Sequence, residues 1–109
     1  MLAVGSSGRG YLLGTDAGKA YLELRETLHS RRLVLPRGDA FRAWPSPDDR
    51  TILVAFNDGT IIAFDTTSLA QEWVFRVPQR PEAADWSSDS TRVALTAQAG
   101  VVIDARDGM

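Results

Sequence analysis

Three aspartates are the side chains best suited to acid–base or metal chemistry in this chain. Asp48 and Asp49 are adjacent, and Asp89 follows in a similar context. A carboxylate pair could bind a divalent cation or transfer a proton. Adjacent residues in a strand or turn point apart, however, and a Ser-Pro-Asp segment is typical of a turn. We therefore expect all three aspartates to form turns, and we predict no metal ligand.

Nucleophilic and phosphate chemistry lack the residues that they need. His29 is the only histidine and there is no cysteine, which excludes thiolate catalysis, disulfides, cysteine-based zinc sites and paired imidazoles. No nucleophile elbow is present, and no carboxylate is placed beside His29 by spacing. Residues 5–10 (GSSGRG) have the composition of a phosphate loop, but a strand follows them where such a loop needs a helix. We predict no catalytic residue, no cofactor-binding residue and no cofactor, so the chain is not expected to be an enzyme.

Four arginines between residues 25 and 37 form a small basic run. Acidic residues lie within the same stretch, and the whole chain has a formal net charge of −2. A nucleic-acid partner is therefore not expected. Charge on an edge strand, which prevents sheets from pairing edge to edge, explains the run more simply. The four residues are Arg25, Arg31, Arg32 and Arg37.

The three tryptophans could stack on a ligand or a partner. Trp73 lies in an alternating apolar and charged segment, which predicts packing between sheets. Trp44 and Trp86 lie where strands are expected to meet turns, so they are the candidate contacts for a protein partner.

Length and composition indicate one globular domain. The chain has 109 residues, of which 44% are hydrophobic and 24% charged. The longest apolar runs, such as residues 52–56, are far shorter than the roughly 20 residues of a membrane-spanning helix. The first residues lack the pattern of a secretory signal. We expect a cytoplasmic protein without a membrane partner.

A regularly spaced repeat organises the chain. Residues 11–15, 52–56 and 93–97 are equally spaced apolar runs, and each precedes a turn whose third residue is glycine, at 16–18, 57–59 and 98–100. Another apolar run follows each glycine, which predicts a hairpin in each unit. The units are 1–41, 42–82 and 83–109.

Four strands are expected in the second unit, at residues 41–44, 51–56, 60–64 and 72–77. The inner two are apolar at successive positions, so both faces of this sheet must be covered. No segment has helical periodicity, so neighbouring sheets must provide the cover. Sheets stacked at about 40-residue intervals are typical of a β-propeller. The predicted fold is all-β: consecutive four-stranded antiparallel blades of an incomplete propeller, with the outer strand missing from the last.

The most buried residues should lie on the inner strands. They are Leu12, Leu53, Val54, Ile61, Ile62, Val93, Leu95 and Val102.

The second unit resembles a blade of the WD-repeat family. Residues 46–55 (SPDDRTILVA) and 57–65 (NDGTIIAFD) are similar to the family's S-P-D-G and D-G-T segments, with Phe64-Asp65 in place of Trp-Asp. Residues 86–89 (WSSD) resemble the start of another blade. Residues 63–75 also resemble blades of quinoprotein-like propellers, without the glycine of that motif. The resemblance implies a β-propeller superfamily and no particular member.

A propeller has four to eight blades, and this chain is long enough for fewer than three units of the size found here. The chain is therefore expected to be a fragment of a longer propeller, one of several copies in a ring, or a short open stack. Bare apolar faces, formed by Leu13 and Tyr21 at one end and Val102 at the other, would then favour self-association.

The function that this resemblance implies is a non-catalytic scaffold that binds another protein. Two alternatives stay open at this point. One is a fragment of a quinoprotein-like enzyme whose cofactor site lies outside this chain. The other is an oligomeric lectin-like propeller.

Overall fold

The computed structural model describes residues 2–4, 10–17, 19–25, 30–36, 38–77, 83–96 and 101–104. Within these ranges the chain forms strands and turns and no helix, so none of the described residues belongs to a helical membrane span. All strand pairs between them are antiparallel. The predicted all-β class is confirmed for the described residues.

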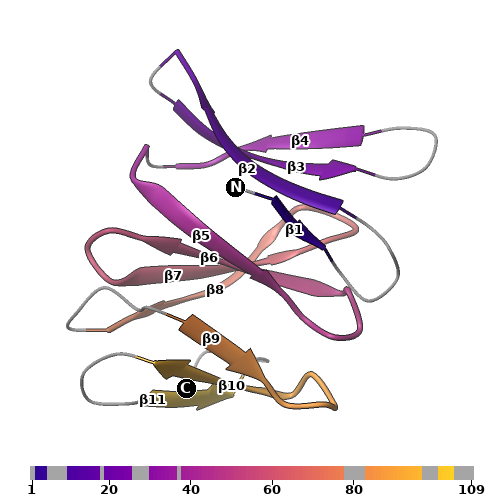
Figure 1. Cartoon of the computed structure of the whole chain (residues 1–109), viewed down its shortest axis with the longest axis vertical. Helices are drawn as coiled ribbons and strands as arrows, with labels where there is room; N and C mark the ends of the chain where they lie inside the picture. The colour runs from indigo at the N-terminus through magenta and orange to yellow at the C-terminus, as the bar shows by residue number, and fades with distance from the viewer. Residues whose placement is uncertain are drawn as a thin grey trace.

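The described strands form three separate sheets that lie one above another (Figure 1). The first sheet has four strands in sequence order: β1 (Leu2–Val4), β2 (Gly10–Asp16), β3 (Lys19–Arg25) and β4 (Ser30–Val34). The second sheet repeats this order with β5 (Ala40–Pro45), β6 (Thr51–Phe56), β7 (Thr60–Asp65) and β8 (Gln71–Arg76). The third sheet contains β9 (Ala83–Trp86), β10 (Arg92–Thr96) and β11 (Val101–Asp104).

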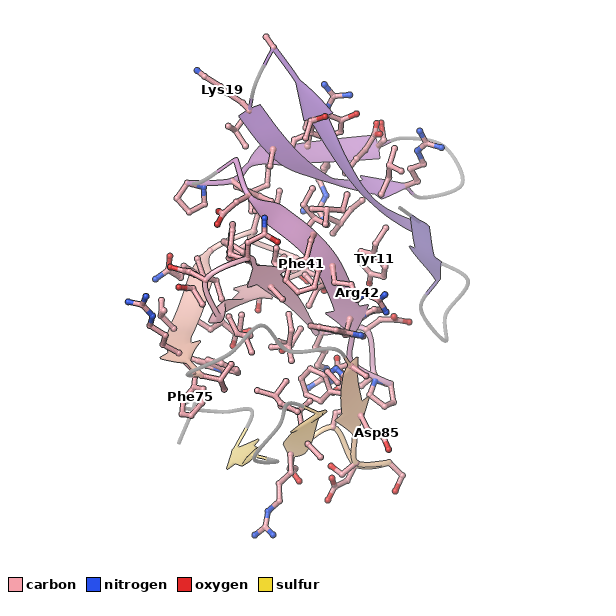
Figure 2. All side chains as sticks on the ribbon, turned by 60° about the vertical axis from the view of Figure 1, so that its left-hand side comes forward. Tyr11, Lys19, Phe41, Arg42, Phe75 and Asp85 are labelled. Carbon is pink, nitrogen blue, oxygen red and sulfur yellow. The ribbon has the colours of Figure 1, made fainter. Side chains whose placement is uncertain are left out.

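The second sheet is buried on both faces. Along β6 and β7 nearly every side chain is buried, because alternate residues point into two different cores. Ile52, Val54 and Phe56 pack against the first sheet. Leu53 and Ala55 pack against the third. The successive apolar residues that predicted two-sided cover are thus explained by two flanking sheets, whose side chains fill the spaces between them (Figure 2).

Most of the predicted strands and core residues are confirmed. The four strands expected in the second unit match β5 to β8 to within one residue at each end. Six of the predicted core residues are at most 4% exposed. They are Leu53, Val54, Ile61, Ile62, Val93 and Leu95. The side chain of Val102 and the turn at 98–100 lie outside the described residues. The first sheet has the four strands that the repeat predicted, although the repeat set no bounds for β1.

Leu12 is the one core prediction that is wrong. It is only partly buried, and its neighbours Tyr11 and Leu13 enter the core between the first and second sheets instead. In the first hairpin Asp16 pairs with Lys19, which leaves two residues in the turn. The second hairpin has three, residues 57–59. One residue fewer shifts β2 by one position against β3, and a shift by one turns every β2 side chain to the opposite face.

The expected bare face formed by Leu13 and Tyr21 is wrong for the same reason. Leu13 is 7% exposed and lies in the core between the sheets. Tyr21 does lie on the outer face of the first sheet, but it is half-buried and the guanidinium of Arg32 covers its ring.

Candidate interaction surface

The β5–β6 turn is closed by the side chains of Ser46 and Asp48. The Ser46 hydroxyl donates to the Asp48 carboxylate at 2.6 Å, and the same carboxylate accepts the backbone N–H of Arg50 at 3.0 Å. The Ser46 oxygen also accepts the N–H of Thr51 at 3.1 Å. Asp48 therefore satisfies backbone donors in a turn, as predicted.

The β9–β10 turn has the same bonds at the equivalent positions of the next unit. The Ser87 hydroxyl donates to Asp89 at 2.7 Å, Asp89 accepts the N–H of Thr91 at 3.1 Å, and Ser87 accepts the N–H of Arg92 at 3.0 Å. The turn prediction for Asp89 is confirmed. The sequence repeat thus places the same serine and aspartate hydrogen bonds in the equivalent turns of the second and third sheets.

The titration of Asp89 reports on this turn. Hydrogen bonds from the Ser87 hydroxyl, followed by those from Thr91, lower the pKa of Asp89 to about 2. Because folding lowers this pKa, the ionised carboxylate stabilises the folded turn. Its contribution to the free energy of unfolding is complete above the unfolded pKa of about 3.9 and is lost as the pH falls toward the folded value. We expect an NMR titration of the Asp89 carboxyl carbon to give a pKa of about 2. The variant Ser87→Ala should raise it toward the ordinary value, whereas a pKa of about 4 in the unmodified chain would contradict the bonded turn.

The fourth residue of each turn connects its sheet to the preceding one. Asp49 and Ser90 have the same left-handed conformation, with φ of 58° and 61°. The hydroxyl of Tyr11 in the first sheet donates to the Asp49 carboxylate at 3.4 Å. The Ser90 hydroxyl accepts the backbone N–H of Asp48 in the second sheet at 3.2 Å. The side chain of Asp49 is therefore used between two sheets, which the sequence did not predict.

The two candidate contact tryptophans lie together at the end of the interface between the second and third sheets. Both are partly buried against the core that these sheets share, and the Trp86 indole N–H donates to the carbonyl of Trp44 at 3.3 Å. Trp44 pairs with Leu53, and Trp86 pairs with Val93, so they approach each other from facing sheets. We call the two turns, 46–50 and 87–91, together with these tryptophans, the turn rim.

Trp73 occupies the place predicted for it. It is 7% exposed in the core between the second and third sheets, while its strand neighbours Glu72 and Val74 are exposed.

Arg31 connects the outer strand of the first sheet to the β7–β8 loop, residues 66–70. Its guanidinium donates to the carbonyls of Thr66 and Thr67. Thr66 in turn donates through its hydroxyl to the carbonyl of Asp49 at 2.5 Å. The loop is also held by Asp65, whose pKa is lowered by the N–H of Ser68, with Thr67 and the charge of Arg31 acting in the same direction. No sequence signal distinguished Arg31 from its neighbours.

The other described arginines of the basic run have separate contacts. Arg25 lies 3.4 Å from the carboxylate of Glu23, and Arg32 lies over the ring of Tyr21. Arg37 lies outside the described residues. The three described arginines therefore do not converge on one basic surface.

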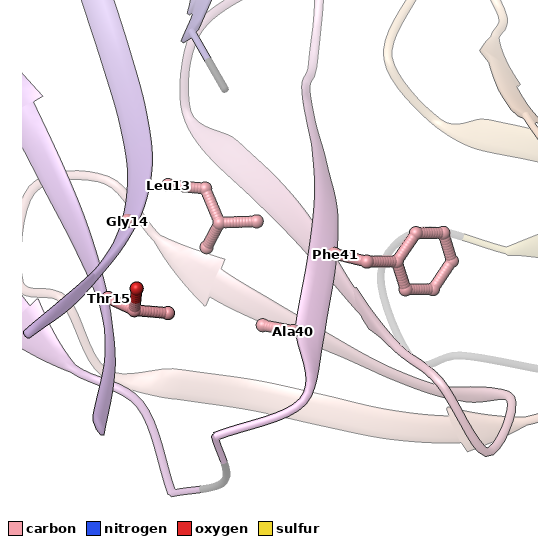
Figure 3. A pocket seen from close by; sticks show the side chains of 5 residues that line it. All are labelled: Leu13, Gly14, Thr15, Ala40 and Phe41. Atoms are coloured by element: carbon pink, nitrogen blue, oxygen red, sulfur yellow. The ribbon is translucent and has the colours of Figure 1, made fainter. Parts of the chain in front are cut away.

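A cleft of about 330 Å³ opens between the first and second sheets. Figure 3 shows Leu13 and Thr15 of β2 and Ala40 of β5 around it, while Phe41 points to the other side of β5. The register of β5 against β6 shifts between Ala40 and Arg42, so that Phe41 packs against the core on the third-sheet side. None of the described residues that line the cleft is titratable, so they offer no acid, base or metal ligand.

Residues with catalytic chemistry do not gather elsewhere in the described ranges. No group of three or more metal-binding side chains occurs among them. His29, and residues 5–9 of the glycine-rich segment, lie outside these ranges. No family model matches the chain, and no curated protein matches it in sequence.

Proposed function

We propose that this chain is a non-catalytic protein-interaction module built from blades of the WD-like propeller type, within a longer propeller-like stack. The observation that supports the proposal is the second sheet, which is covered on both faces by flanking sheets and carries the same bonded turn as the third sheet. Rigid sheets that present loops at their ends are common supports for binding sites.

The turn rim is the surface proposed to bind the partner protein. Its exposed positions include Pro47, Asp48, Arg50 and Ser88, beside two half-buried tryptophans. Tryptophan and arginine are frequent among the residues that carry binding energy at protein interfaces. The backbone hydrogen bonds of both turns hold these side chains in place without the partner, which reduces the ordering cost of binding.

Two substitutions on the rim test the proposal. Arg50→Glu and Ser88→Arg change exposed side chains that no turn hydrogen bond described above uses. With a partner identified by crosslinking and purified, each should weaken binding by about tenfold or more, the size expected for residues at the centre of an interface. Binding is measured by calorimetry.

The matched control is Asn57→Arg, an exposed turn position between β6 and β7 at the opposite end of the second sheet. It should leave the affinity unchanged. An equal loss of affinity in the Asn57 control and the rim variants, or full affinity in both rim variants, would contradict the rim as the docking surface.

A further inference from the structure

The outer face of the first sheet differs from every face that another sheet covers. This sheet forms one end of the stack, and no described strand lies beyond it (Figure 1). The register places two central rows of residues across its outer face, with the row of Arg25 and Ser30 on one side of them. Leu2, Leu12, Glu23 and Arg32 form one central row, and Gly14, Tyr21 and Val34 form the other.

Side chains of the sheet itself cover the tyrosine on this face, while Val34 at its edge stays 59% exposed. The ring of Tyr21 extends over Gly14, where an added Cβ would lie 2.7 Å from the tyrosine hydroxyl oxygen. Arg32 lies over the same ring, 3.9 Å from its centroid, in cation–π geometry. Arg25 lies against Glu23, whose side chain is only 14% exposed. The glycine leaves room for the ring, and the arginines leave charge on the surface.

Faces covered by a sheet have a different composition at the corresponding positions. On the side of β6 and β7 that meets the first sheet, the buried residues are all apolar: Ile52, Val54, Phe56, Ile62 and Phe64. Glu23 on β3, opposed by Arg32 on β4, occupies the middle of the outer face. A second sheet placed here would strip water from both charges, and the ion pair that Glu23 forms with Arg25 would rarely recover that loss in full.

We infer that the outer face of the first sheet is a capping face, which ends the stack in water and does not receive another sheet. Stacked repeat proteins need such polar outer faces at their ends to remain soluble. The inference rests on the stacked-blade part of the proposed function and is independent of the turn rim. A stack with such a capped end does not close into a ring, so that further sheets can join only beside the third sheet.

Cysteine labelling tests the accessibility of this face, since the chain has no cysteine of its own. The reporter is Val34→Cys, at a position that is 59% exposed. Ser68→Cys serves as the exposed reference and Ala63→Cys as the buried one. In the intact chain a maleimide should label the Val34 variant at a rate within about threefold of the Ser68 variant, at every protein concentration. It should label the Ala63 variant at least about 100-fold more slowly, because the sheet must first open around that site. A Val34 rate more than about tenfold below the Ser68 rate, or one that falls as concentration rises, would show a covered face and overturn the inference.

A second experiment removes the charges of the cap. The double variant Glu23→Leu with Arg32→Leu should associate in a concentration-dependent manner by light scattering, because the face becomes apolar. Arg42→Leu with Glu72→Leu makes the same change in charge at exposed positions on the two edge strands of the second sheet, outside the turn rim, and should not associate. If the cap variant behaves like this control, the charged pair has no capping role. Loss of partner binding in the rim variants leaves both results unaffected, so the two proposals can fail separately.

Discussion

Replacing Ile61 by alanine will lower the free energy of unfolding by about 2–5 kcal/mol, the usual range for removing a large buried aliphatic side chain. Ile61 is 0% exposed and belongs to the core between the second and third sheets, together with Leu53, Val93 and Leu95. β7 is paired with β6 on one side and with β8 on the other, so its backbone cannot shift locally to close the cavity left by Ile61. Urea denaturation followed by tryptophan fluorescence measures the change.

Val74→Ala is the matched control. Val74 lies on the adjacent strand β8 and is 50% exposed, so its truncation should cost less than about 0.5 kcal/mol. A cost below about 0.5 kcal/mol at Ile61 in a folded chain would show that the third sheet does not cover this face.

The pair Leu13→Ala and Leu12→Ala will have very different effects although the residues are adjacent. Leu13 is 7% exposed in the core between the first and second sheets, so its loss should cost about 2–5 kcal/mol. Leu12 is only partly buried on the outer face, so its truncation should lower the free energy of unfolding by about 1 kcal/mol or less.

The difference tests the register of the first hairpin. Leu13 pairs with Leu22, and Leu12 pairs with Glu23, because the turn holds two residues. A three-residue turn would exchange their faces. If thermal and urea denaturation find the larger loss in Leu12→Ala, the two-residue turn is wrong.

The local architecture could be predicted from the sequence because its signals are local. Apolar runs bounded by glycine, asparagine and aspartate predicted the hairpins of the second unit. The Ser-x-Asp segments predicted turns because a carboxylate two residues after a serine can reach both its hydroxyl and the following N–H groups. The turn roles of Asp48 and Asp89 therefore needed no knowledge of the rest of the chain.

The candidate surface could be predicted only in part. Trp44 and Trp86 were recognised as lying beside turns, but not as partners across two sheets. Arg31 was one of four similar arginines, and only the position of the β7–β8 loop gives its guanidinium two carbonyls to bind. Asp49 was expected to serve its own turn, and the structure shows that it also receives a bond from Tyr11 of the neighbouring sheet.

Composition, spacing and turn chemistry by themselves determined that this chain forms antiparallel hairpins in repeated units and that the second unit needs cover on both faces. The tertiary structure alone decided which sheet provides each cover and which residues of β2 face it. The physical reason is the two-residue period of a strand: one residue more or less in a turn costs little locally, yet it reverses the faces of every side chain in one of the two strands that the turn joins. That one-residue difference places Leu13 in the core and Leu12 outside, on a face that Tyr21, Arg32 and Glu23 complete.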